Sequence, residues 1–443
     1  MPRERNATAA VRAGIATDRH HNAVVPPIHL SSTFAFDGFD QKGRYDYTRS
    51  GNPTRDILAE AIAELEGGSS AVITSSGMSA VALVLQLLKP GDLVLATHDC
   101  YGGTHRLLTH LAKRGLFDVE FADLGESARA GHAPPLLGSS VIPSAAARRA
   151  AESRNPLLGD RQADPSTSHP LRGCSGRDDV APLHSRPPKL VWIETPSNPL
   201  LRITDIAAVA EHAHAAGALV VVDNTFLSPA WQQPIEHGAD IVVHSTTKYI
   251  NGHSDVVGGA VIARDAALGE ELAWWANALG ITGAPFDSYL TLRGLRTLDA
   301  RCRVHAENAA AVVAALAEHP AVAKVWYPGL ADHPGHDIAC RQQSGFGAMV
   351  SFELHGAEES VRAFLDGLEC FTLAESLGGV ESLVAHPATM THVSMGEEGR
   401  RNAGISDTLL RLSVGIERAE DLVADLRQGL LRVERSAATA VVG

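Results

Sequence analysis

The sequence predicts an α/β fold with a mostly parallel central sheet, followed by a smaller α+β C-terminal domain. Much of the chain before Arg293 alternates short apolar runs with helical patterns, which is typical of βαβ units. After Arg293 the pattern changes to long Ala-rich helices with few strands between them. The chain has 443 residues, more than one ordinary hydrophobic core holds, so we expect two domains.

The composition argues against several classes of protein. The formal net charge is −13, whereas nucleic acids and anionic membranes select basic surfaces. No apolar stretch reaches the roughly 18 residues of a membrane span. Residues 1–17 lack the apolar core of a signal peptide, so a cytoplasmic protein is expected. The five cysteines form no Cys-x-x-Cys pair, and we expect neither a disulfide framework nor a metal site.

The expected strands are apolar runs, most of them bounded by Gly, Pro or polar turn residues. Strands that alternate with helices form parallel sheets, and ligands bind beyond the carboxyl ends of those strands. The expected strands are 71–74, 92–96, 190–194, 219–223, 240–244 and 259–263, with helices at 78–88 and 206–215 between them.

We expect three parts in the chain. Residues 1–60 are extended and loop-rich, and are interpreted either as an arm that wraps a neighbouring subunit or as a loosely packed N-terminus. Residues 61–293 form the large domain and residues 294–443 the small one. In the small domain the pattern predicts helices at 301–318, 359–368 and 419–434 and a strand at 348–354.

Residues 125–187 do not fit this pattern. They contain no aromatic residue and no Lys, but eight Arg and eight Pro. Such composition is typical of a loosely ordered, low-complexity chain, and we expect a disordered insertion or a spurious segment. Extra loop length costs little entropy, so the core can still assemble around it.

Lys248 is the first candidate catalytic residue. Lysine is scarce in this chain, and Lys248 lies in a polar turn just beyond the expected strand 240–244. Lysine forms Schiff bases with carbonyl cofactors when its pKa is lowered. The hydroxyls of Ser245 and Thr247 are placed to bind a phosphate beside it. A capped turn with a solvated lysine explains this segment equally well.

Asp223 is a candidate partner for a cationic ring. It ends the apolar run 219–223, and a buried carboxylate without a partner is costly. A protonated pyridine nitrogen is one such partner. The ordinary alternative is an aspartate that closes a turn or caps a helix.

Three further strand ends carry suitable groups. Ser76, Gly77 and Met78 open a helix whose free N–H groups can bind phosphate, although Ser and Gly also form ordinary N-caps. Tyr101 can stack on a flat cofactor or be a buried structural residue. Asn198 can hydrogen-bond a ligand or form a turn. Together, five strand ends supply the groups that pyridoxal 5′-phosphate (PLP) requires.

The motifs around these residues resemble the Cys/Met-metabolism family of PLP enzymes. The resemblance covers nearly the whole chain except residues 125–187. It is carried by residues 240–255 (DIVVHSTTKYINGHSD), 45–55 (YDYTRSGNPTR), 222–229 (VDNTFLSP), 273–277 (AWWAN), 286–289 (FDSY) and 372–383 (TLAESLGGVESL).

The resemblance implies an aspartate-aminotransferase-type fold and a homotetramer built from two catalytic dimers. It also implies a role for each matching residue. Lys248 is the Schiff-base lysine, Asp223 the pyridinium partner and Tyr101 the stacking ring. The phosphate ligands are Ser76, Gly77, Met78, Ser245 and Thr247, with Tyr47 and Arg49 from a neighbouring subunit, and the substrate contacts are Arg411, Ser376, Asn198, Glu375 and Asp46.

The implied reaction is a γ-replacement that joins O-succinylhomoserine or O-acetylhomoserine to cysteine and gives cystathionine. Elimination from cystathionine at Cγ or Cβ and sulfhydrylation of acylhomoserine stay open, because a few pocket contacts decide among them. Ser50 departs from the second Arg found in bacterial members and bears on the choice of leaving group. An inactive PLP-fold protein is the alternative outside enzymes, and residues 125–187 are its support.

Overall fold

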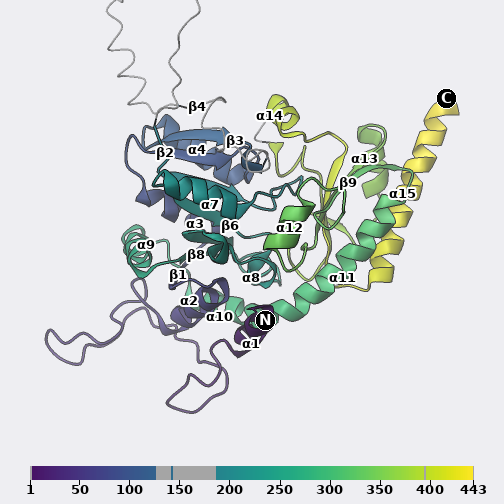
Figure 1. Ribbon diagram of the computed structural model, residues 1–443. Helices are drawn as coiled ribbons and strands as arrows, with labels where there is room; N and C mark the ends of the chain where they lie inside the picture. The colour runs from purple at the N-terminus through teal and green to yellow at the C-terminus, as the bar shows by residue number, and fades with distance from the viewer. Residues whose placement is uncertain (1, 126–140, 143–185, 394–395, 443) are drawn as a thin grey trace, which may run out of the picture.

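The chain folds around two β-sheets joined by a long helix. The computed structural model describes residues 2–125, 141–142, 186–393 and 396–442. Figure 1 shows the larger sheet with helices on both faces, and the smaller sheet beside it under the C-terminal helices.

The larger sheet has eight strands in the described residues, in the order β1-β8-β7-β6-β5-β2-β3-β4. The five central strands, from β7 to β3, pair in parallel. β8 is antiparallel to both β7 and β1, so β1 points the same way as β7. The strands are β1 (Ser70–Thr74), β2 (Leu93–Thr97), β3 (Asp118–Ala122), β4 (Val141–Ile142), β5 (Leu190–Glu194), β6 (Leu219–Asp223), β7 (Ile241–Ser245) and β8 (Gly259–Ala263).

Both faces of this sheet are buried. Val220 and Val222 belong to one apolar cluster, whereas Val221 between them belongs to the other. Because neighbouring side chains point to opposite faces, a strand covered on both sides must be apolar throughout, as these runs are. The helices before the C-terminal part are α1 (Pro2–Arg12), α2 (Pro53–Glu66), α3 (Gly77–Val84), α4 (Gly102–Lys113), α7 (Ile206–Ala215), α8 (Ser228–Trp231), α9 (Ala266–Leu279) and α10 (Pro285–Leu295), with 3-10 turns η1 (Leu85–Leu87) and η2 (Pro234–His237).

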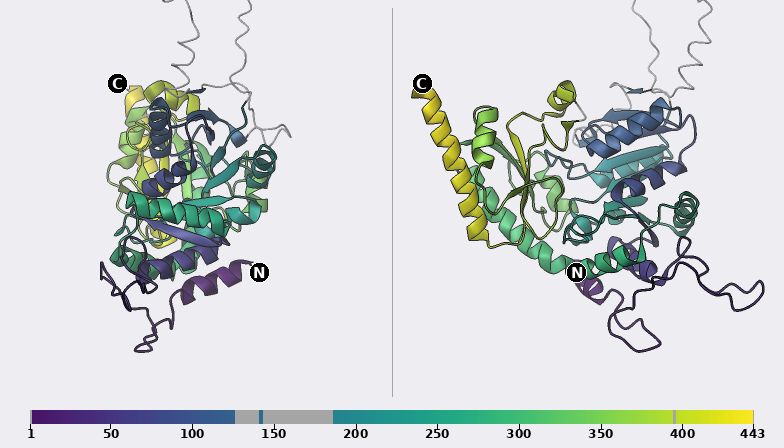
Figure 2. Two further views of the ribbon diagram at one scale, coloured as in Figure 1. Left: turned by 90° about the vertical axis from the view of Figure 1, so that its left-hand side faces the viewer. Right: turned by 180° about the vertical axis from the view of Figure 1, so that it is seen from behind.

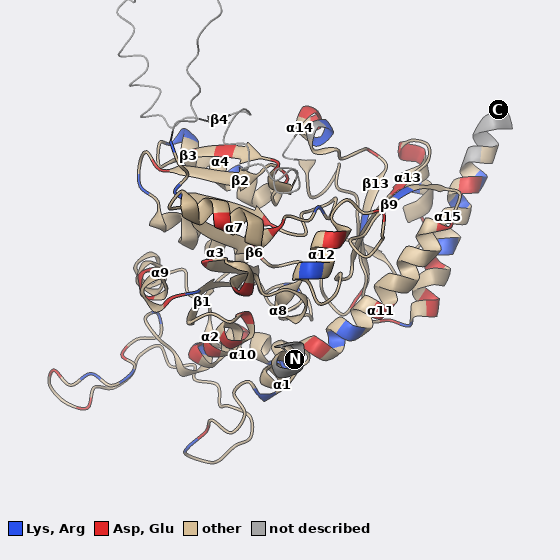
Figure 3. Ribbon diagram, viewed as in Figure 1, with Lys and Arg blue, Asp and Glu red and all other residues tan. Residues whose placement is uncertain are grey.

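The smaller sheet has the order β11-β12-β13-β10-β9 and is antiparallel except between β11 and β12. Figure 2 shows α11 running from the larger sheet to the C-terminal helix. In Figure 3, charges of both signs lie along α11 and α15. The elements are α11 (Leu298–Ala317), β9 (Val322–Trp326), α12 (His336–Gln342), β10 (Met349–Leu354), α13 (Glu358–Leu365), β11 (Thr372–Leu373), β12 (Leu383–Ala385), α14 (Gly396–Ala403), β13 (Leu409–Ser413) and α15 (Ala419–Val442).

The N-terminal region, residues 1–60, differs from the expected extended arm in two respects, because helix α2 already starts at Pro53 and because the region begins with helix α1. Ala10 and Ala13 are buried against the main core, which explains why this segment is helical. The irregular stretch that follows extends away from the body as two long loops (Figures 1 and 2). Phe39 on this stretch is 99% exposed and Leu30 68% exposed.

Sequence patterning did not find β3, although all five of its residues are buried. Asp118 and Glu120 interrupt the apolar run, and Asp118 is paired with Arg186 at 2.5 Å. Most of the segment 125–187 lies outside the described residues; within it, β4 pairs with β3. In the described parts of the chain, every helix is too short or too polar to cross a bilayer.

Candidate active site

A cavity of about 320 Å³ lies at the carboxyl edge of the larger sheet and is closed on one side by the smaller sheet. Six described strands point toward this edge, and five of them, β1, β2, β5, β6 and β7, contribute residues at or just beyond their ends to the cavity. Its lining includes Ser76, Gly77, Met78, Val81, Tyr101, Thr104, Glu194, Pro196, Asn198, Asp223, Thr225, Phe226, Ser245, Thr247, Lys248, Val257, Glu375, Ser376, Leu377, Thr391 and Arg411.

Lys248 lies in the turn after β7, and its amine points into the cavity region. Its Nζ donates a hydrogen bond to Ser376 Oγ at 2.7 Å. The pKa of Lys248 is lowered to about 8, mainly by burial and also by the Arg411 charge, while Glu375 opposes the shift. A lysine with this pKa is partly neutral near neutral pH, as a nucleophilic amine must be.

Asp223 and Glu194 bring two carboxylates together, since they are register partners at the ends of β6 and β5. Burial raises the pKa of Asp223, although Asp223 Oδ1 accepts from the Thr225 N–H at 3.0 Å. Burial and the adjacent Asp223 carboxylate raise the pKa of Glu194, which accepts from the Tyr101 N–H at 2.6 Å. A cationic group beside Asp223 would offset the cost of its burial.

The start of α3 lies close to the end of β7. Ser76 caps the helix by accepting from the Ser79 N–H at 3.1 Å. A Cβ added to Gly77 would lie 2.8 Å from the Ser245 Cβ, so only glycine allows this approach. The Thr247 hydroxyl accepts from the Gly258 N–H at 3.0 Å. The result is a cluster of hydroxyls at a helix N-terminus, which is favourable for an anion.

The Tyr101 side chain stands at the first turn of α4 and is 44% exposed. A Cβ on Gly103 would come within 2.5 Å of the Tyr101 ring and 2.9 Å of Met78 Sδ. Gly103 therefore provides the space that the ring occupies beside the cavity.

Arg411 projects from β13 and is only 3% exposed. Its Nη1 donates to Asn198 Oδ1 at 2.9 Å and its Nη2 to the Ser376 carbonyl at 3.0 Å. Among the described residues its Nε has no hydrogen-bond partner, and no acidic side chain there forms an ion pair with the guanidinium. Burial lowers the pKa of Arg411 to about 10. A buried guanidinium with this arrangement is suited to a carboxylate ligand.

Asp46, Tyr47 and Arg49 are predicted site residues that the chain does not bring to its own cavity. They lie on the N-terminal stretch, where Asp46 pairs with Lys42 at 2.9 Å. Arg49 Nη1 donates to the Asn277 side-chain oxygen at 2.9 Å. All other predicted site residues line the cavity.

Sequence reasoning missed several cavity residues, and Glu194 is the most informative. Glu194 ends an apolar strand just as Asp223 does, so the rule that selected Asp223 would also have selected it. Other missed residues lie in the first turn of α4 (Thr104) or in loops without a distinguishing pattern, such as Thr225, Phe226 and Thr391.

This fold, with a lysine of lowered pKa and a buried carboxylate at the sheet edge, defines a PLP-dependent enzyme. The chain belongs to the Cys/Met metabolism PLP-dependent enzyme family, whose model matches residues 7–133 and 172–431. The internal segment that the family model leaves unmatched, residues 134–171, is therefore shorter than the segment 125–187 that was expected to fall outside the resemblance.

Several relatives carry specific names. The chain is 52% identical to cystathionine gamma-synthase of Escherichia coli K12, over 96% of this chain and 97% of the relative. It is 42% identical to cystathionine gamma-lyase of Dictyostelium discoideum, over 96% and 97%. A solved cystathionine gamma synthase from Xanthomonas oryzae pv. oryzae, in complex with cystathionine, is 58% identical with a TM-score of 0.83, over 97% and 98%.

Proposed function

We propose that this enzyme catalyses a γ-replacement that joins O-succinylhomoserine or O-acetylhomoserine to L-cysteine and gives cystathionine. The relatives at 52% and 58% identity bear the name of that synthase, and one was solved with cystathionine. The observation that carries the proposal is the contact of both Lys248 and Arg411 with Ser376, which brings to one residue an amine of lowered pKa and a guanidinium that forms no ion pair with a described acidic side chain.

The residues around the cavity fit PLP. Lys248 would bond to the cofactor carbonyl, Asp223 would meet the ring nitrogen and Tyr101 would stack on the ring. When bound, PLP supplies an electron-withdrawing ring that stabilises negative charge at the substrate Cα. The phosphate would lie against the start of α3 and the end of β7, on Ser76, Gly77, Met78, Ser245 and Thr247.

Arg411 would bind the α-carboxylate of the amino-acid substrate, with Asn198 and the Ser376 loop beside it. This placement sets the substrate Cα near Lys248. The freed Lys248 amine would take the Cα proton. Once that proton has been passed on, the same amine would remove a proton from Cβ, and the electron pair left at Cβ would form the Cβ–Cγ double bond and expel the γ-acyloxy group. Glu375, next to Ser376, would help orient the incoming amino acid.

A second subunit would complete the site. Asp46, Tyr47 and Arg49 lie on a stretch with exposed apolar side chains such as Phe39 and Leu30, which is suited to cover by another chain. We propose that Tyr47 and Arg49 reach the phosphate of a neighbouring subunit's cofactor within a homotetramer, and that Asp46 approaches its substrate. In this arrangement residues 1–60 form the arm, 61–293 the large domain and 294–443 the small domain of a cytoplasmic enzyme.

The deciding experiment is a substrate panel with purified enzyme. Cysteine-dependent conversion of O-succinylhomoserine or O-acetylhomoserine to cystathionine should exceed breakdown of cystathionine. Faster cleavage of cystathionine would assign the chain to the lyases, two of which, from Dictyostelium discoideum and Bacillus subtilis, are 42% and 41% identical. Lys248→Ala should abolish the visible absorbance of bound cofactor and turnover, and γ-replacement retained in that variant would reject the site.

A further inference from the structure

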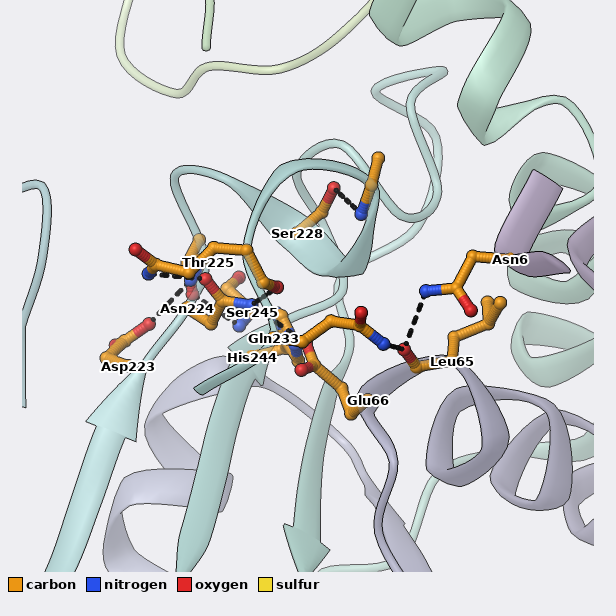
Figure 4. Close-up of polar contacts among 12 residues, drawn as sticks. Asn6, Leu65, Glu66, Asp223, Asn224, Thr225, Ser228, Gln233, His244 and Ser245 are labelled. Atoms are coloured by element: carbon orange, nitrogen blue, oxygen red, sulfur yellow. Dashed lines mark hydrogen bonds and ion pairs between the residues drawn. The ribbon is translucent and has the colours of Figure 1, made fainter. Parts of the chain in front are cut away.

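Glu66 is a fully buried carboxylate at the last residue of α2, behind the strand ends that border the cavity. Its Oε1 accepts from Asn224 Nδ2 at 2.8 Å and lies 2.5 Å from His244 Nε2. Figure 4 shows the Glu66, Asn224 and His244 side chains gathered at the ends of β6 and β7. One carboxylate oxygen therefore holds a residue from each of two neighbouring strand ends.

Each of these two residues is next in sequence to a predicted cofactor ligand. Asn224 directly follows Asp223, and His244 directly precedes Ser245. Successive side chains along a strand point to opposite sides. Asp223 and Ser245 accordingly line the cavity, whereas Asn224 and His244 point away from it toward Glu66.

The end of α2 is itself held in place. The Leu65 carbonyl accepts from Asn6 Nδ2 at 3.1 Å and from Gln233 Nε2 at 2.6 Å (Figure 4). A Cβ on Gly68 would lie 2.3 Å from the Ile262 Cγ2, so the chain after the helix packs directly on the sheet. Glu66 thus projects from a fixed point.

Two buried atoms of this cluster argue against a role in stability alone. Glu66 Oε2 and His244 Nδ1 have no hydrogen-bond partner among the described residues. Leaving buried polar atoms unsatisfied costs free energy, and apolar side chains of similar volume often fill such a space at no loss of stability. A polar cluster that carries this cost is typical of a functional constraint.

We propose that Glu66 is a positioning residue that holds Asp223 and Ser245 at the separation required by the ring nitrogen and the phosphate of PLP. This inference rests on the proposed roles of Asp223 and Ser245. Two contacts on one ligand reinforce each other only when their spacing matches the ligand, because the second contact then forms without a further loss of freedom.

The test compares PLP with pyridoxal, which has the ring and aldehyde but no phosphate. Dissociation constants of both are measured on the full-length apoenzyme from the absorbance of bound cofactor. The preference for PLP is the dissociation constant of pyridoxal divided by that of PLP. In Glu66→Ala this ratio should fall by about tenfold, because misplaced contacts lose part of the roughly 10²–10⁴-fold gain in affinity that two linked contacts provide. Visible circular dichroism of bound PLP, which reports ring orientation, should change as well.

Glu64→Ala is the matched control, since Glu64 is an exposed residue of the same helix. It should leave the preference unchanged. A general loosening of the protein would weaken PLP and pyridoxal by the same factor. An unchanged preference in folded Glu66→Ala would overturn the inference.

Two more variants keep the inference decidable. If Glu66→Ala does not fold, Glu66→Gln preserves the volume but weakens the charge-assisted bonds, and a loss of preference of about threefold is expected; an unchanged preference there overturns the inference too. Ser245→Ala should also reduce the preference. If Ser245→Ala reduces the preference and the Glu66 variants leave it unchanged, the positioning role of Glu66 is rejected and the phosphate site stands. If Ser245→Ala has no effect, the proposed phosphate site is wrong.

Discussion

The Lys248 amine donates a hydrogen bond to Ser376 Oγ over 2.7 Å, from one sheet of the protein to a loop of the other. The carbonyl of the same serine accepts from Arg411. The amine that would bond to the cofactor and the guanidinium that would bind the substrate are therefore set relative to each other by one residue. Their separation depends on how the two parts of the chain pack.

The rate at which the apoenzyme binds PLP should increase with pH and level off above about 8. Only the neutral amine attacks a carbonyl, and burial lowers the pKa of Lys248 to about 8. Below that pH the rate should fall about tenfold per unit. Stopped-flow absorbance on apoenzyme measures it; a midpoint near 10.5, the ordinary lysine value, would contradict the burial argument.

Arg411→Gln should impair substrate binding. It should also move the midpoint of the pH profile for PLP binding, which reports the pKa of Lys248, to higher pH. Loss of a buried, charge-assisted partner for the α-carboxylate should lower kcat/KM by an amount that corresponds to about 2–5 kcal/mol of lost transition-state stabilisation. The pH shift follows because the Arg411 charge contributes to lowering the pKa of Lys248. Steady-state kinetics and the stopped-flow profile check the two effects. Arg341→Gln serves as control, since Arg341 is an exposed residue that pairs with Asp205.

Ser376→Gly should be more stable than Ser376→Ala, yet both should bind PLP more slowly than the parent. Ser376 has φ 95°, a conformation that strains a residue with a side chain by about 1–3 kcal/mol. Glycine releases that strain. Both variants lose the hydroxyl that accepts from Lys248. Urea unfolding of the two variant apoenzymes measures the difference in their free energies of unfolding. Equal values for Ser376→Gly and Ser376→Ala would contradict the prediction that the backbone at Ser376 is strained.

Glu194→Gln should stabilise the apoenzyme, increasingly so as pH rises. The pKa of Glu194 is raised in the folded protein by burial and by Asp223, so the folded state holds its proton more tightly than the unfolded state. Stability from this group is present below the ordinary glutamate pKa of 4.5 and is lost as pH rises toward the folded value. Gln does not titrate and avoids that loss. Unfolding free energies from pH about 5 to about 8 should diverge, and parallel curves would contradict the prediction.

Much of the larger sheet could be predicted because its strands are continuous apolar runs. The 190–194, 219–223 and 259–263 strands begin and end where the pattern placed them. Polar residues at the strand ends then predicted Lys248 and Asp223, since parallel strands deliver their carboxyl ends to one edge. β3 was not predicted because Asp118 and Glu120 interrupt its apolar pattern, and its pairing with β2 in the folded chain is what identifies it as a strand.

The sequence by itself determined the fold class, the family resemblance and which strand ends carry chemical groups, because local periodicity and motif letters contain that information. Only the tertiary structure decided how those groups work together. The lowered pKa of Lys248 comes from burial and from Arg411, which lies 163 positions away in the chain. The contact of Glu66 with the residues beside Asp223 and Ser245 likewise joins three distant segments. Desolvation and charge interactions depend on distance in space, which packing sets and a linear pattern does not reveal.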